Sequence, residues 1–122
     1  MGTSRQKLGR RGEEIARRYL EQKNYRVVES NFRTPWGEID IVARKDDFLV
    51  FVEVRTRKGG VFGLPEESVT REKIQHIIDS AEEYMQSHDI ADVSWRIDMV
   101  AINVDSNNRI ERIDLLENVS TV

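Results

Sequence analysis

The sequence contains no cysteine, which excludes disulfide bonds, thiol nucleophiles and cysteine-rich zinc sites. A chain without disulfides suits a reducing compartment, so we expect a cytoplasmic protein. Long apolar runs are also missing, because the longest, Phe48–Val52, cannot cross a bilayer and the charged N-terminus is unlike a secretory signal. These absences predict a protein with no membrane partner.

The sequence also has no internal repeat, low-complexity tract or linker rich in proline and serine. Its 122 residues are 39% hydrophobic and 34% charged, which is the balance of a globular protein able to bury one core. We therefore expect a single domain over residues 1–122, with residues 1–6 as a candidate disordered end.

The net charge of −3 conceals an uneven distribution along the chain. Residues 1–33 carry nine lysines and arginines against four glutamates, whereas residues 34–122 carry ten against eighteen acidic residues. The basic end could face the phosphates of a nucleic acid, but a charged helix commonly has only a solvated polar face. Charge alone leaves both interpretations open.

Apolar periodicity and turn residues predict elements in the order α-β-β-β-α-β-β. Residues 4–22 and 70–87 have helical spacing, and the glycine-rich residues 56–68 predict a mobile loop. This order describes an α/β domain with a mixed central sheet flanked by helices, in which the second helix allows one parallel strand pair. The candidate strands are residues 25–33, 38–44, 48–55, 94–104 and 109–116.

Several charged residues fall on the second and third candidate strands. Side chains alternate across a strand, so every second residue shares a face. The two predicted groups that share a face are Glu38, Asp40 and Val42 on the second strand, and Phe51, Glu53 and Arg55 on the third.

The hairpin between these strands sets their register. If residues 45–48 form the loop, Arg44 pairs with Leu49, and Asp40 then lies directly opposite Glu53. Two carboxylates facing each other amid apolar residues repel and are costly to desolvate unless a cation lies between them. Carboxylate oxygens suit magnesium or manganese, so the register predicts a divalent metal site.

A second interpretation of the same carboxylates stays open. Asp40 or Glu53 could point to solvent or pair with an arginine such as Arg55, which the same register sets opposite Glu38. Charges on strands are commonly used in this way.

The spacing of these residues resembles known enzymes. Asp40, followed one hairpin later by Glu53-Val54-Arg55, is similar to the D...(D/E)-x-K core of the PD-(D/E)XK nuclease superfamily. More specifically, nearly the whole chain resembles the YraN family of small bacterial proteins, which are regarded as predicted endonucleases related to archaeal Holliday junction resolvases. The motifs that carry this resemblance are Gly9-x-x-Gly12-Glu13-x-x-Ala16-x-x-Tyr19-Leu20, Asn31-Phe32-Arg33, Gly37-Glu38-Ile39-Asp40 and Phe51-Val52-Glu53-Val54-Arg55-Thr56-Arg57.

The resemblance implies a restriction-endonuclease-like fold in which Asp40 and Glu53 bind Mg²⁺, or Mn²⁺ in its place, and Glu13 approaches as a third acidic group. The helical wheel agrees, because Glu13 falls at the edge of the apolar stripe and Glu14 on the exposed face. Where the superfamily has a lysine, this chain has Arg55. Arginine stays protonated, so Arg55 could clamp a phosphate but is a poor general base.

Four further residues are candidates for nucleic-acid contact or for outer support of the site. Lys73 could touch a phosphate or be an ordinary solvated lysine. Arg96 and Asp98 lie two apart on one strand face and form either a buried ion pair that braces the sheet, which we favour, or a second shell around the site. Arg57 follows Arg55 in the family motif.

The indole of Trp36 lies in the predicted turn before Gly37, where it could stack on a nucleobase or cap the edge of the core. The two histidines, His76 and His88, are too far apart in the sequence to form a zinc site. Neither observation assigns a role.

Together, the alternation of side chains on the strands and the family resemblance predict a Mg²⁺-dependent endonuclease that hydrolyses phosphodiester bonds in structured or branched DNA. A two-fold junction substrate would favour a homodimer. The competing hypothesis is a non-catalytic module that keeps the nuclease fold and binds nucleic acid or protein, motivated by Arg55 and by the modest basicity of the chain.

Overall fold

The computed structural model describes residues 4–59 and 70–119, and for residues 4–6 only the backbone. Helices and strands follow one another in the predicted order α-β-β-β-α-β-β. Their bounds are α1 Ser4–Gln22, β1 Arg26–Thr34, β2 Gly37–Lys45, β3 Phe48–Lys58, α2 Arg71–Ser87, β4 Ser94–Val104 and β5 Ile110–Leu116.

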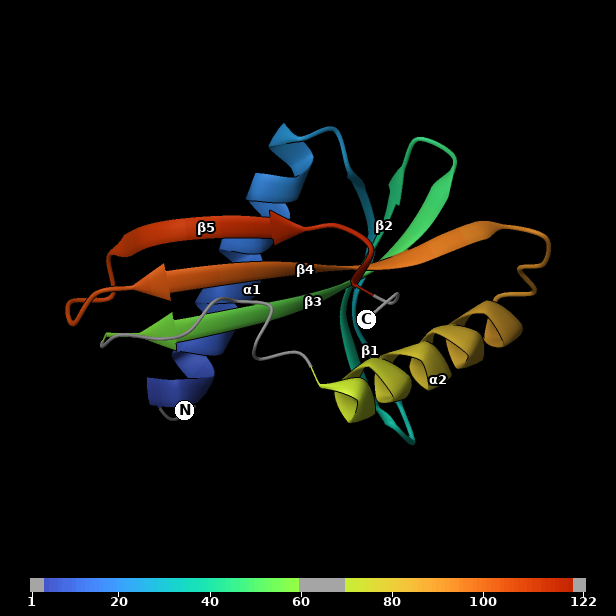
Figure 1. Cartoon of the computed structure of the whole chain (residues 1–122), viewed down its shortest axis with the longest axis horizontal. Helices are drawn as coiled ribbons and strands as arrows, with labels where there is room; N and C mark the ends of the chain where they lie inside the picture. Colours follow the sequence, from blue (N-terminus) through green and yellow to red (C-terminus); the bar gives the residue numbers. More distant parts are fainter. Residues whose placement is uncertain (1–3, 60–69, 120–122) are drawn as a thin grey trace.

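The strands form one mixed sheet whose order, β1-β2-β3-β4-β5, is the same as their order in the chain. The pairs β1–β2, β2–β3 and β4–β5 are antiparallel, and β3–β4 is parallel. Two parallel neighbours need a crossover connection, which α2 supplies as predicted. The sheet is strongly twisted, so that β1 and β2 cross the direction of β3, β4 and β5 (Figure 1).

The two helices cover opposite faces of this sheet (Figure 1). Ala16 and Leu20 of α1 pack on one face, whereas Ile74, Ala81 and Tyr84 of α2 pack on the other. The central strands are buried on both sides, which explains their continuous apolar runs. Within the described residues, no helix is both long and apolar enough to cross a membrane.

The third strand is longer than predicted. β3 continues to Lys58, three residues into the segment 56–68 that the sequence predicts to be a loop, because Arg57 and Lys58 continue the parallel ladder with Asn103 and Val104 of β4. Gly59 is the last described residue before the gap. Residues 60–69, which make up most of the predicted loop, and residues 1–3 of the predicted disordered end lie outside the described residues.

Candidate metal centre

The hairpin of β2 and β3 has the predicted register, since Arg44 pairs with Leu49. The ladder, however, ends at the pair of Ile41 and Val52, one residue before the predicted pair of carboxylates. The predicted register is therefore confirmed as far as Ile41 and Val52, and the pairs Asp40–Glu53 and Glu38–Arg55 lie beyond the end of the ladder. The alternation rule holds for β3 but carries no information about where two strands stop pairing.

The strict alternation predicted for Glu38, Asp40 and Val42 is also broken. Ile39 packs in the same apolar cluster as Val42, three residues away, whereas Ile41 packs in the cluster on the opposite face. The interruption coincides with Asn31 of β1, which lies between the pairs Ser30–Ile41 and Phe32–Ile39 and has a positive φ of 56°. A left-handed residue in a strand changes the direction of the side chains around it. Here Glu38 and Asp40 depart from the regular alternation of the sheet.

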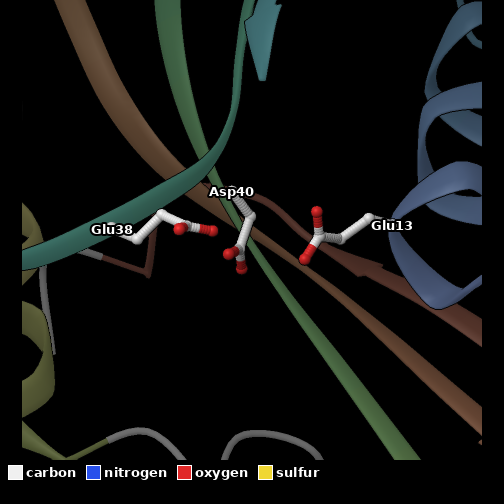
Figure 2. Close-up of side chains that lie close together, drawn as sticks. All are labelled: Glu13, Glu38 and Asp40. Carbon is white, nitrogen blue, oxygen red and sulfur yellow. The ribbon is translucent and has the colours of Figure 1, made fainter. Parts of the chain in front are cut away.

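Three carboxylates converge where the pleat is interrupted. Glu13 of α1 and Glu38 and Asp40 of β2 each offer an oxygen atom, and these oxygens all lie within 4.8 Å of one another. Figure 2 shows the carboxylates of Glu13 and Glu38 on either side of Asp40, approaching from the helix and from the strand. Glu53 of β3 interacts electrostatically with all three. We refer to Glu13, Glu38, Asp40 and Glu53 as the acidic cluster.

The position of Glu13 depends on the glycine before it. A Cβ atom on Gly12 would lie 2.0 Å from the Oγ1 atom of Thr56 on β3, so only glycine allows α1 to pack this closely against the strand. The next residue, Glu14, is exposed and forms an ion pair with Arg18 at 2.8 Å. The structure therefore agrees with the helical wheel, which placed Glu13 inward and Glu14 outward.

Asn31 connects two members of the acidic cluster. Its side-chain amide nitrogen, Nδ2, donates to Glu13 Oε1 at 2.7 Å and to Glu38 Oε1 at 2.8 Å. Glu38 also forms an ion pair with Arg33 at 3.5 Å. Asparagine tolerates the left-handed backbone better than most residues and supplies two N–H donors, so one side chain satisfies both requirements.

The crowding of carboxylates in the cluster favours the protonated form of Asp40. Burial raises the pKa of the Asp40 carboxyl to about 8, and the charge of Glu53 raises it as well. A hydrogen bond from the Val54 backbone N–H to Asp40 Oδ2, at 2.8 Å, opposes the shift, whereas Glu13 and Glu38 add to it. Like charges this close cannot all ionise without a cation, so the site favours either a proton or a metal.

Two basic residues moderate the same repulsion at Glu53. Burial raises the pKa of the Glu53 carboxyl, and the positive charges of Arg55 and Lys73 lower it. Arg55 Nε lies 3.3 Å from Glu53 Oε1, so the predicted arginine contact exists beside the convergence of carboxylates. Lys73 lies in the first turn of α2, where its backbone N–H donates to the capping hydroxyl of Thr70 at 3.2 Å.

The donor set fits a hard divalent cation. All the candidate ligand atoms are carboxylate oxygens, which Mg²⁺ and Mn²⁺ prefer, and their mutual repulsion would be relieved by a positive ion. The group of three includes Glu38, which was absent from the predicted ligands Asp40, Glu53 and Glu13. Glu53 contributes from the neighbouring strand through its charge on Asp40.

Comparison with known proteins identifies the family. Residues 12–102 match the model of "Uncharacterised protein family UPF0102". The chain belongs to the UPF0102 family. A UPF0102 protein of Dehalococcoides mccartyi is 42% identical over 118 residues, which cover 97% of this chain and 96% of the relative. Relatives from Roseiflexus castenholzii (46% over 101 residues, 82% of each chain) and Syntrophomonas wolfei (44% over 107 residues, 87% of this chain and 93% of the relative) agree. The resemblance to the YraN family is thereby confirmed.

In this UPF0102 protein, Arg96 and Asp98 form hydrogen bonds with each other and with Tyr25, outside the acidic cluster. Asp98 is fully buried and accepts hydrogen bonds from Arg96 Nε at 3.1 Å, from the Tyr25 hydroxyl at 2.7 Å and from the Asn118 backbone N–H at 2.9 Å. Burial, and after it the hydrogen bond to Asp98, raises the pKa of Tyr25. The pair joins β4 to the start of β1 and to the C-terminal segment, which is the bracing interpretation favoured from the sequence.

Arg57 and Lys73, the two other candidates, have different surroundings. Arg57 pairs with Asn103 in the β3–β4 ladder and is half-buried. Lys73 lines a surface pocket with Glu53 and Arg55, so it adjoins the UPF0102 acidic cluster. Contact of either residue with nucleic acid stays a prediction.

Sequence reasoning missed three contributors to this UPF0102 site: Glu38, Asn31 and Gly12. All three stand in the motifs of the family resemblance, and that was the available signal. Alternation placed Glu38 on the same face as Asp40, but the predicted register gave it Arg55 as a partner. Periodicity gave no reason to select Asn31, which acts through a left-handed backbone, or Gly12.

Proposed function

We propose that this protein is a Mg²⁺-dependent endonuclease with a PD-(D/E)XK-like core that hydrolyses phosphodiester bonds in structured or branched DNA. The observation that carries the proposal is the convergence of carboxylate oxygens from Glu13, Glu38 and Asp40 within 4.8 Å, beside Glu53 and Arg55 on the adjoining strand. Acidic residues gathered from a helix and two strands without enough neighbouring cations form a site prepared for a divalent ion.

Asp40 and Glu53 would hold the metal, with Glu13 and Glu38 completing the oxygen donors. Mg²⁺, when bound, polarises a phosphate and makes water more acidic. The metal would replace the proton that the free site retains near neutral pH, so binding should release a proton and tighten as the pH rises toward 8.

Arg55 is suited to bind the substrate phosphate. Its guanidinium adjoins Glu53, and it can donate hydrogen bonds to phosphate oxygens and stabilise negative charge that develops on them. A carboxylate is the better proton acceptor, and Glu13, which the helix presents at the edge of the cluster, is the candidate.

The phosphate backbone of DNA matches the positive groups around the cluster. Arg55 and Lys73 line one pocket beside it, and Arg10 and Arg17 of α1 line another that contains Glu13 and Asn31. We propose cytoplasmic DNA with branches or unpaired segments as the partner, and a homodimer where the branch has two-fold symmetry.

The decisive experiment combines metal binding with cleavage. Isothermal titration of Mg²⁺ and Mn²⁺ into wild type, Asp40→Asn and Glu53→Gln is followed by incubation with junction and flap DNA and gel analysis. We expect both substitutions to weaken metal binding and eliminate detectable cleavage. Neither should lower the melting temperature, because each replaces a carboxyl group whose ionised form is opposed by burial and by neighbouring carboxylates. Asp47→Asn, in the exposed β2–β3 turn, is the matched control and should behave as wild type.

Cleavage by both cluster variants at the wild-type rate would overturn the assigned site. Metal binding that depends on Asp40, without cleavage of any DNA, would instead support the non-catalytic module, for which the ion pair of Arg55 with Glu53 is the favouring observation. That module would bind DNA in the presence of a chelator, with an affinity that falls as salt rises.

A further inference from the structure

We propose that Trp36 is a stacking platform for one unpaired nucleobase, in the pocket between the β1–β2 turn and α2 beside the acidic cluster. The inference rests on the proposed function, because it needs a nucleic-acid strand at the cluster. It adds to that function the recognition of one unpaired base next to the phosphate that is cleaved.

The indole of Trp36 is exposed although it is large and apolar. Its exposed fraction is 46%, which places it with Val28 and Ile110 among the exposed large hydrophobic residues of the described chain. About half of its surface is therefore available to a ligand, which favours the stacking interpretation over a cap on the core. Exposed aromatic side chains are the surfaces on which proteins stack single-stranded bases.

The turn that carries Trp36 is fixed to α2. The Thr34 hydroxyl accepts the Trp36 backbone N–H at 3.1 Å and donates to the Gly37 carbonyl at 2.9 Å. The same hydroxyl lies 2.8 Å from the hydroxyl of Ser80, which is buried in α2. These bonds tie the backbone of the turn to the helix before any ligand binds, so stacking would cost little ordering of the chain.

The pocket beside the indole joins base recognition to the catalytic groups. It has a volume of about 130 Å³, and its walls contain Trp36, Glu38, Glu53, Arg55 and Lys73. Its cations lie next to the carboxylate of Glu53, as the ion pair of Arg55 and the effect of Lys73 on that carboxyl demonstrate. A nucleotide whose phosphate meets Arg55 and Lys73 would have its base on the Trp36 side of the same pocket.

Such a base must be unpaired. In a duplex both faces of a base are covered by its neighbours, and stacking on a protein ring requires the base to leave that stack. Single-stranded flaps, loops and junction branch points offer free base faces at no unstacking cost. Trp36 would therefore favour strands with unpaired bases over continuous duplex, largely independently of base sequence.

The test compares binding of two fluorescein-labelled probes by anisotropy, a dT oligonucleotide of about 12 nucleotides and a blunt duplex of equal length. Ca²⁺ replaces Mg²⁺, and intact strands are verified on a gel. We expect Trp36→Leu to lose about tenfold in affinity for the single strand and less than about twofold for the duplex, with Trp36→Phe retaining most of the single-strand affinity. Val28→Ala, which removes a comparably exposed apolar side chain from β1, should change neither.

A second measurement does not depend on the folding of Trp36→Leu. In a Trp95→Phe background Trp36 is the remaining tryptophan, and the single strand should quench its fluorescence whereas the duplex should not. Wild-type binding of the single strand with no quenching and no effect of Trp36→Leu would overturn the stacking role while the proposed function stood. Absence of binding to either probe would overturn both.

Discussion

The acidic cluster and the buried pair of Arg96 and Asp98 both withdraw charge from water, but they treat it in opposite ways. Asp98 is fully buried, yet it is surrounded by donors, with Arg96, the Tyr25 hydroxyl and the Asn118 backbone N–H all within hydrogen-bond distance. Asp40 has the Val54 N–H and three further carboxylates. The charge of Asp98 is thus satisfied within the fold, whereas the acidic cluster brings together like charges whose repulsion a cation would relieve.

The largest expected effect tests the satisfied side of this comparison. Asp98→Ala leaves Arg96 buried without its partner, and we expect the free energy of unfolding to fall by about 3–5 kcal/mol. Urea denaturation measures this loss, and Asp47→Ala in the exposed turn should change it by less than about 0.5 kcal/mol. A loss below about 1 kcal/mol for Asp98→Ala would mean that the pair does not brace the sheet.

The pH dependence of stability tests the unsatisfied side. Without metal, the native state keeps a proton on Asp40 up to a pKa of about 8, whereas the unfolded chain releases it near pH 4. Between these limits the native state binds more protons than the unfolded state, so the free energy of unfolding should fall as pH rises, by about 1.4 kcal/mol per pH unit for one proton. The slope should disappear above pH 8.

Urea denaturation in EDTA across this pH range measures the slope. Asp40→Asn should reduce it, because the amide does not titrate, and saturating Mn²⁺ should reverse it, because the metal binds the ionised form. Asp47→Asn should keep the wild-type profile. If the Asp40→Asn profile matched that of wild type, Asp40 would not hold the proton.

Gly12→Ala should weaken the mutual repulsion in the acidic cluster by moving the Glu13 carboxylate away from the other three. The added Cβ would meet Thr56 Oγ1 at 2.0 Å, so we expect α1 to shift from β3 and the free energy of unfolding to fall by about 1–3 kcal/mol. Mn²⁺ affinity should fall as well, because Glu13 moves with the helix. Thermal melting and isothermal titration give the two measurements.

A matched control for this substitution lies one turn away. A Cβ on Gly9 meets nothing within 4 Å, so Gly9→Ala should leave the melting temperature unchanged or raise it. Thr56→Ala should rescue Gly12→Ala, because the nearest remaining atom, the Thr56 Cβ, would be 3.3 Å away. Failure of this rescue would show that the contact with Thr56 is not the cause.

The smallest expected effect is on metal affinity, and it comes from removing the Asn31 amide that donates hydrogen bonds to the cluster. Asn31→Gly keeps the left-handed backbone but removes the amide that joins Glu13 to Glu38, so we expect Mn²⁺ affinity to fall by about tenfold. Asn24→Gly is the control, because Asn24 is another asparagine with positive φ, at the junction of α1 and β1. Equal affinities of the two variants would exclude a role of Asn31 in arranging the carboxylates.

The sequence predicts the fold and part of the site for identifiable reasons. Turn residues and alternation are local signals, and they gave the element order, the pairing of Arg44 with Leu49 and the grouping of Glu53 with Arg55. The end of the β2–β3 ladder before Asp40 is not a local signal, because it follows from the twist of the whole sheet and from the left-handed Asn31.

The difference between local and non-local signals also explains why Asp40, Glu53 and Glu13 were predicted as ligands and Glu38 was not. Asp40 and Glu53 could be predicted from a hairpin, and Glu13 from the family resemblance and the edge of a helical stripe. The sequence predicts that Glu38 faces Arg55, but its partners are Asn31 and Arg33 on the other neighbouring strand. A pattern that describes one strand pair at a time cannot decide between two neighbours.

The parallel pairing of β3 with β4 has a consequence for how the protein is made. All four carboxylates of the acidic cluster are synthesised before α2, yet β3 lies between β2 and a strand that follows α2. Ribosomal synthesis therefore releases the complete set of candidate ligands ahead of the strand that fixes one of them. Because parallel pairing must wait for its crossover helix, we expect Glu53 to be fixed beside the other three carboxylates only after the second half of the chain has folded onto the hairpin.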